Sequence, residues 1–292
     1  MKSYHLHQTW SRVWMKTIFI LVSVIVVFPF IIMVLTALKS NQEISQGLSA
    51  FFPETPLFSN FVTAMQKGNW GRYFINTIII TGFAVIISLV INSLAGYAFA
   101  RMRFAGKTIL FYCAMVGMML PMQVIMIPVF LQIKELPLVG GNDFFGNGGI
   151  GLVNNYAGVI LPLIAHPFGV FLCRQFFMGF PKELDEAAKI DGCSPLQIYL
   201  KLYIPMGIPI FATLGLLKFV DTWNQYTWPL LVFNDPEMNT VQLALNAFKG
   251  ENVTEWNYLM AATIVIILPI LVLFVCLQRY FVQGIATTGM KD

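Results

Sequence analysis

Long apolar stretches separated by short polar connections dominate the chain. Six of them are long enough to cross a bilayer as helices, because a hydrocarbon core about 30 Å thick needs roughly 20 apolar residues per crossing. They cover residues 17–38, 75–100, 109–133, 156–179, 206–233 and 259–282. Alternating strands of about ten residues, which are typical of a spanning barrel, are absent. The pattern predicts an all-α membrane protein, with six transmembrane helices in a single domain over residues 1–292.

Composition supports this prediction. Hydrophobic residues make up 57% of the 292 positions and charged residues 11%, which is too apolar for a soluble globular domain. The first stretch follows Lys2, Arg12 and Lys16 and is longer than the roughly 7–15 residues of a cleaved signal core. We therefore expect it to be an uncleaved anchor.

The positive charges predict the orientation. With the N-terminus inside, the inner connections hold twelve of the 18 Lys and Arg residues and the outer connections hold five, while Lys218 lies within a stretch. Lys and Arg favour the cytoplasmic side. Both termini, and the loop over residues 181–204, are therefore expected in the cytoplasm.

The loop between the fourth and fifth stretches is polar and carries helix signals. Pro181 suits a first helical turn, and Glu183 and Glu186 suit the positive end of a helix dipole. Gly192 suits a left-handed helix end. Ser194 and Gln197 have the spacing of a capping box. The loop is predicted to form two short helices along the membrane surface, where an ordinary cytoplasmic hairpin is the alternative.

At this loop the sequence resembles the permease subunits of bacterial binding-protein-dependent ABC importers. Their motif has Glu-Ala-Ala, then a glycine, then a proline at fixed offsets, and the chain matches it with Glu186, Ala187, Ala188, Gly192 and Pro205. Two aliphatic positions are exchanged in Leu202-Tyr203-Ile204-Pro205. Further similarity, in residues 97–101, 223–230, 259–262 and 278–284, is to the second permease of carbohydrate importers of the maltose type. The Gly- and Asn-rich run within 137–155 is longer than is usual in that family.

The resemblance implies a type I importer fold that forms half of an inner-membrane pathway for an oligosaccharide and works by alternating access. The implied partners are a second, related permease, two cytoplasmic ATPase subunits that bind ATP and Mg²⁺, and an extracytoplasmic solute-binding protein. This chain is expected to bind no cofactor itself. The residues implied to couple to the ATPase are Glu183, Glu186, Ala187, Ala188, Asp191, Gly192 and Pro205. The loop 234–258 is implied to face the binding protein through Asn246, Phe248, Lys249 and Gly250.

Charges inside the fifth stretch have two interpretations. Lys218 and Asp221 are three residues apart and can meet on one helix face. They form either a neutralised structural pair or, with Asn224 and Gln225, a surface that lines the pathway and bonds to sugar hydroxyls. Both interpretations stay open at this stage.

Residues for other chemistries are sparse. The three histidines form no HExxH pair, and the four cysteines have no metal-ligand or redox spacing. Gly106-Lys107-Thr108 resembles the end of a phosphate-binding loop, but Arg101 stands where that loop requires a glycine. We therefore predict no catalytic residue and no metal site. The alternative function is an ion-coupled secondary transporter or channel, which would require several intramembrane carboxylates, and Asp221 is the only acidic residue well inside a stretch.

Overall fold

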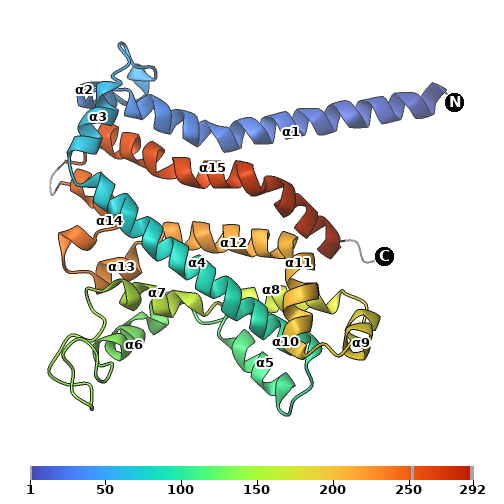
Figure 1. Ribbon diagram of the computed structural model, residues 1–292. Coiled ribbons are helices and arrows are strands. Elements are labelled where there is room, and N and C mark those ends of the chain that lie inside the picture. Colours follow the sequence, from blue (N-terminus) through green and yellow to red (C-terminus); the bar gives the residue numbers. More distant parts are fainter. Residues whose placement is uncertain (1, 251–252, 290–292) are drawn as a thin grey trace. The chain divides into compact units, whose positions relative to one another are not determined.

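The computed structural model describes residues 2–250 and 253–289, and all of its long elements are helices (Figure 1). The chain divides into two compact units. One comprises the residues up to Gly68 together with Leu245–Leu268, and the other comprises Asn69–Ala244 together with the residues from Pro269 onward. The loop 234–258 therefore contributes to both units.

Three helices of the described chain are long and apolar enough to cross a membrane without a break. They are the Trp14–Ala37 part of α1 (Lys2–Ala37), α4 (Trp70–Arg101), and the Trp256–Arg279 part of α15 (Trp256–Gly289). They correspond to the first, second and sixth predicted spans. An all-helical membrane protein is thus confirmed.

Two further spans are bent. Helix α7 (Tyr156–Ile164) continues into α8 (Pro167–Met178) after a bend of 41°, and residues Pro195–Met206 continue into α12 (Ile208–Trp223) after a bend of 78°. Each continuing helix has a proline in its first turn, Pro167 in α8 and Pro209 in α12, where the N–H that proline lacks would have no partner within the helix. With each bent pair counted as one span, the described residues contain up to five spans.

The third predicted span and the end of the fifth are interrupted in the structure. Residues 109–133 divide into α5 (Lys107–Val116) and α6 (Met122–Lys134), which begins after Pro121. Residues 206–233 do not form one helix, since α12 ends at Trp223 and a separate short helix, α13 (Thr227–Val232), follows. Hydrophobic length alone does not reveal these interruptions.

The first unit holds α1, the short helices α2 (Asn41–Ser45), η1 (Gly47–Ala50) and α3 (Ser59–Gln66), then η4 (Leu245–Phe248) and the start of α15. The buried amide of Asn60 donates to the carbonyls of Ala37 and Lys39, both at 2.9 Å. This joins α3 to the end of α1. The ammonium group of Lys67 lies 2.6 Å from the Glu255 carboxylate at the start of α15.

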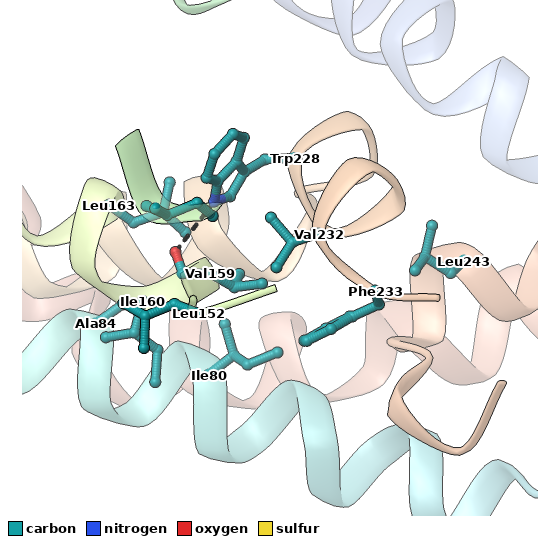
Figure 2. Close-up of a cluster of buried hydrophobic side chains, with 11 residues drawn as sticks. Ile80, Ala84, Leu152, Val159, Ile160, Leu163, Trp228, Val232, Phe233 and Leu243 are labelled. Carbon is teal, nitrogen blue, oxygen red and sulfur yellow. Dashed lines mark hydrogen bonds between the residues drawn. The ribbon is translucent and has the colours of Figure 1, made fainter. Parts of the chain in front are cut away.

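The second unit is built on α4, which packs against α7, α8 and α12. One apolar core lies between α4, α7 and α13, and Figure 2 shows its side chains. Trp228, fully buried in that core, donates its indole N–H to the Val159 carbonyl at 3.3 Å. Because this bond satisfies the indole N–H, Trp228 packs in the apolar core without leaving a donor unpaired.

The loop after α6 is rich in turns and is held together by hydrogen bonds between its own side chains and backbone. Asn142 donates to the carbonyls of Lys134 and Leu136 at 2.8 and 3.0 Å, and Asp143 accepts from two backbone N–H groups. Asn154 then accepts from the backbone of Asn234 and Asp235, just before η3 (Pro236–Met238) and α14 (Val241–Ala244).

Helices α4 and α8 approach closely because Gly96 has no side chain. A Cβ at Gly96 would lie 2.5 Å from the Cβ of Cys173 on α8. Ser88, Asn92 and Ser93 occupy the same buried face of α4. Small residues of this kind let membrane helices pack against one another.

We expect Gly96→Ala to destabilise the protein by about 1–3 kcal/mol, because the added methyl group forces α4 and α8 apart. Thermal unfolding of the purified protein in detergent measures this effect. The matched control is Gly82→Ala on the same helix, where a Cβ would meet nothing within 4 Å and where alanine is the better helix former. Equal stability of the two variants would contradict the close approach.

Candidate functional site: the polar loop helices

The polar loop folds into short helices, as its sequence signals predict. Helix α9 (Glu183–Ile190) has Glu183, Asp185 and Glu186 in its first turn. It ends at Gly192, whose φ is 77°. The N–H of Gly192 donates to the Lys189 carbonyl at 3.0 Å, and that of Cys193 donates to the Ala188 carbonyl at 2.9 Å. This pair of bonds is a Schellman motif, so the predicted left-handed helix end is confirmed.

The second short helix, α10 (Pro195–Ile198), begins with the predicted capping box. The Ser194 hydroxyl accepts from the Gln197 N–H at 3.3 Å, and the Gln197 side chain accepts from the Ser194 N–H at 2.8 Å. The helix continues through η2 (Tyr199–Tyr203), a π-helical segment, into α11 (Ile204–Met206). Pro205 is exposed and lies just before the 78° bend into α12.

Helix α9 has an outer and an inner face. Glu183, Glu186, Ala187 and Ile190 are exposed, and Ile190 is 87% exposed despite being a large apolar residue. Asp185 and Ala188 point inward and are buried. The expectation that Ala188 contacts the ATPase together with Ala187 does not fit this conformation, because Ala188 packs in the apolar core beside Ile198 and Tyr199. Asp191 and Gly192 are exposed at the end of the helix.

An ionic cluster fixes the inner face of α9. The Asp185 carboxylate accepts two contacts from the Tyr203 hydroxyl, at 2.9 and 3.0 Å, and lies 3.4 Å from the guanidinium group of Arg101, the last residue of α4. Arg101 also donates to the carbonyls of Phe177 and Phe180 at the end of α8. One arginine thus connects α4, the end of α8 and α9. The side chains of Arg101 and Asp185 are only 8% and 12% exposed.

Aromatic packing surrounds this cluster. The ring of Tyr203 lies 4.9 Å from that of Tyr97, 5.2 Å from that of Phe177 and 5.5 Å from that of Phe180. The Tyr97 hydroxyl donates to the Pro195 carbonyl at 3.1 Å. Because the cluster is shielded from water, its charged hydrogen bonds are stronger than surface ones.

None of Arg101, Asp185 and Tyr203 was predicted as a site residue. These residues are far apart in the sequence, so no local sequence pattern indicates that they meet. The one available indication was periodicity, since Asp185 and Ala188 are three residues apart and face the same side of a helix.

The charges in α12 form the predicted pair. The Lys218 ammonium group lies 3.1 Å from the Asp221 carboxylate, with the Lys218 side chain 3% exposed and that of Asp221 47% exposed. Gln225 donates to Asp221 at 3.5 Å, and Gln242 donates to Asn224 at 3.0 Å. These four side chains therefore form two hydrogen-bonded pairs, Asp221 with Gln225 and Asn224 with Gln242, of which Gln242 was not predicted.

The four residues predicted to face the binding protein differ in exposure. Phe248 is fully buried in the first unit, with its ring 6.5 Å from that of Tyr258, so it cannot present itself to a partner in this conformation. Lys249 and Gly250 are exposed, and Asn246 is half-buried. Lys249 pairs with Thr254 in an isolated β-bridge. Residues 251–252 of this loop lie outside the described residues.

Among the described residues, no group of three or more His, Cys, Asp or Glu side chains could hold a metal ion. In the polar loop, an exposed face of α9 lies opposite a buried ionic anchor.

Comparison with known proteins identifies the family. A profile of the binding-protein-dependent transport system inner membrane components matches residues 92–287. The chain belongs to this family. It is therefore a non-catalytic permease subunit of an ABC importer, and this membership decides against an ion-coupled secondary transporter or channel.

Full-length relatives agree with this assignment. The chain is 33% identical over 282 residues to AraQ of Halalkalibacterium halodurans, an arabinooligosaccharide transport permease, and the match covers 95% of this chain and 96% of that protein. It is 29% identical to the sn-glycerol-3-phosphate permease UgpE of Escherichia coli, with 96% and 97% covered. A chain from a crystal structure of a bacterial alginate ABC importer matches with a TM-score of 0.77 at 24% identity, covering 92% and 95%. The similarity to this solved structure shows that the two chains share a fold.

We expect Asp185→Ala to destabilise the protein by about 3 kcal/mol, because it leaves Arg101 as a buried charge without its carboxylate. The matched control is Glu186→Ala, which removes the same charge one residue later from the exposed face. Chemical or thermal unfolding of the purified protein compares the two. A loss in Glu186→Ala as large as in Asp185→Ala would argue against the anchor.

Proposed function

We propose that α9 is a coupling helix whose outer face docks into a groove on a cytoplasmic ATPase subunit. The observation that carries this proposal is the exposure of Ile190 beside Glu186 and Ala187, on a helix whose opposite face is anchored inside the permease. An exposed apolar side chain rimmed by charges is typical of a protein-binding surface. Glu183, Asp191 and Gly192 border this face, and Pro205 sets the entry into α12.

The anchor gives this docking a mechanical consequence. Because Arg101 holds α9 to the ends of both α4 and α8, a displacement of α9 moves those two helices with it. ATP binding by the ATPase pair would draw two such coupling helices together and switch the permease between two packings. ATP and Mg²⁺ bind the ATPase subunits, and this chain binds neither. Only a differential affinity for the two packings can drive the switch.

The assembly that we propose is the type I arrangement. Helices α5 and α6 together supply the sixth span, and both termini and the 181–204 loop face the cytoplasm, as the distribution of Lys and Arg favours. A second, related permease completes the pathway in the inner membrane. A solute-binding protein outside docks on the loop 234–258, where Asn246, Lys249 and Gly250 are the accessible residues of the predicted set.

The proposed cargo is an oligosaccharide. The names of two similar transporters support this class, since one imports arabinooligosaccharides and the other alginate. Two hydrogen-bonded pairs, Asp221 with Gln225 and Asn224 with Gln242, offer carboxylate and amide partners for sugar hydroxyls. The name of UgpE makes sn-glycerol 3-phosphate the second compound to test.

Transport by the complete importer in proteoliposomes tests the proposal. The chain is reconstituted with its companion permease, ATPase and binding protein, and ATP-dependent uptake of labelled oligosaccharides and of sn-glycerol 3-phosphate is measured. We expect saccharide uptake that requires ATP and the binding protein. Uptake by the permeases without the ATPase would refute the coupling role, and uptake of glycerol phosphate alone would refute the saccharide class.

Replacing Ile190 tests the docking face. We expect Ile190→Ser to weaken ATPase association by about tenfold or more, because loss of a buried apolar anchor costs about 1.5–3 kcal/mol. Substrate-stimulated ATP hydrolysis and co-purification of the ATPase measure the effect. Ile190→Leu, which keeps the apolar volume, should retain both. Unchanged coupling in the serine variant would remove Ile190 from the interface.

Paired substitutions in α12 separate the two interpretations of its charges. Asp221→Ala alone leaves the buried Lys218 without its carboxylate and should lower stability. The double variant Lys218→Met with Asp221→Leu removes both charges and should restore stability. If Asp221 lines the pathway, uptake by the stable double variant falls at least tenfold, as measured by saccharide transport. Normal uptake by that variant would make the pair purely structural.

A further inference from the structure

A pocket lies between the end of α4, the turn that follows it, and the loop helices α9 and α10. Its volume is about 590 Å³. It belongs entirely to the second unit, and α5 begins at its edge with Lys107. Its lining includes the five cationic residues Arg101, Arg103, Lys107, Lys182 and Lys189, together with the carboxylates Asp185 and Glu186.

Positive charge is in excess in this pocket. Asp185 is already engaged by Arg101 and by the Tyr203 hydroxyl. Glu186 is therefore the only other carboxylate of the lining, and it is exposed on α9. Four cations remain against one carboxylate, so the pocket attracts an anion.

Two cationic side chains of the lining have unusual environments. The Nε of Arg101 is buried and has no hydrogen-bond partner among the described residues, although the rest of its guanidinium group is well bonded. Partial burial lowers the pKa of Lys107, and the nearby positive charges of Arg174 and Arg103 lower it further. A buried donor without an acceptor is uncommon and calls for a ligand or a water.

The surroundings of the pocket suggest the source of the anion. Helix α4 is a membrane-spanning helix, and Arg101 at its end lines the pocket. On the other side, Ile109 and Leu110 of α5 are 70% and 53% exposed, two and three residues after Lys107. A lipid bound here would place its headgroup among the cations and its acyl chains along α5.

We propose that this pocket binds the phosphate-containing headgroup of an anionic phospholipid from the inner leaflet. Basic pockets between membrane helices on the cytoplasmic side bind such headgroups. The inference rests on the proposed function only for the side of the membrane that the loop faces. A bound headgroup would neutralise the cations beside α9 and so stiffen its attachment to α4.

Lipid retention by the complete importer tests this site. The assembly is purified in detergent, titrated with phosphatidylglycerol or phosphatidylcholine, and examined by native mass spectrometry. The test variant is Arg103→Gln with Lys107→Gln, which leaves the Arg101 anchor and the outer face of α9 intact. The matched control is Lys201→Gln, because Lys201 is exposed in the same loop region and does not line the pocket.

We expect wild type and Lys201→Gln to retain phosphatidylglycerol in preference to phosphatidylcholine, and the double variant to bind it roughly 30-fold more weakly. Equal retention by the double variant would overturn the proposal. Displacement of the lipid by millimolar inorganic phosphate would assign the pocket to a soluble anion instead. Loss of the ATPase from the double variant in lipid-free detergent would assign it to an acidic segment of that partner.

The readouts distinguish this inference from the proposed function. Retention of lipid is measured without ATP or cargo, so it stands even if uptake fails. Conversely, if the wild-type importer transports normally but shows no preference for phosphatidylglycerol, the lipid site is contradicted and the proposed function is not.

Discussion

The contact between Arg101 and Asp185 is the interaction on which the polar loop of the second unit depends. It joins residues more than eighty positions apart and holds three helices through one guanidinium group. Tyr203 provides both charged groups with a further partner. Its hydroxyl donates to the Asp185 carboxylate, and the centre of its ring lies 5.5 Å from the Cζ of Arg101. A buried charge pair is tolerable only when such additional partners satisfy it.

Local signals in the sequence predicted the local structure well. The Gly192 helix end and the Ser194–Gln197 capping box lie within a few residues of the features that define them, so spacing alone identifies both. The apolar stretches predicted a helical membrane protein for the same reason, since hydrophobic length is a local property. Motif offsets predicted the family through Glu186, Gly192 and Pro205, and the matching profile confirms that assignment.

Features that depend on tertiary packing were not predictable in this way. Ala188 is implied by the motif to contact the ATPase, yet it lies on the same face of α9 as Asp185, which is anchored inward, and is buried. Phe248 lies in a polar loop but fills an apolar site in the first unit. The interruptions at Pro121 and after Trp223 also depend on where neighbouring helices can satisfy the freed backbone groups.

The same packing supports the proposed coupling role of the polar loop. Helix α9 has only eight residues, which is too short to be stable by itself, so its rigidity must come from the groups beneath it. The Schellman end and the capping box fix its direction, whereas the ionic anchor fixes its position. A stiff outer face of this kind transmits a displacement, whereas a helix held only by water-exposed contacts would absorb it by local unfolding.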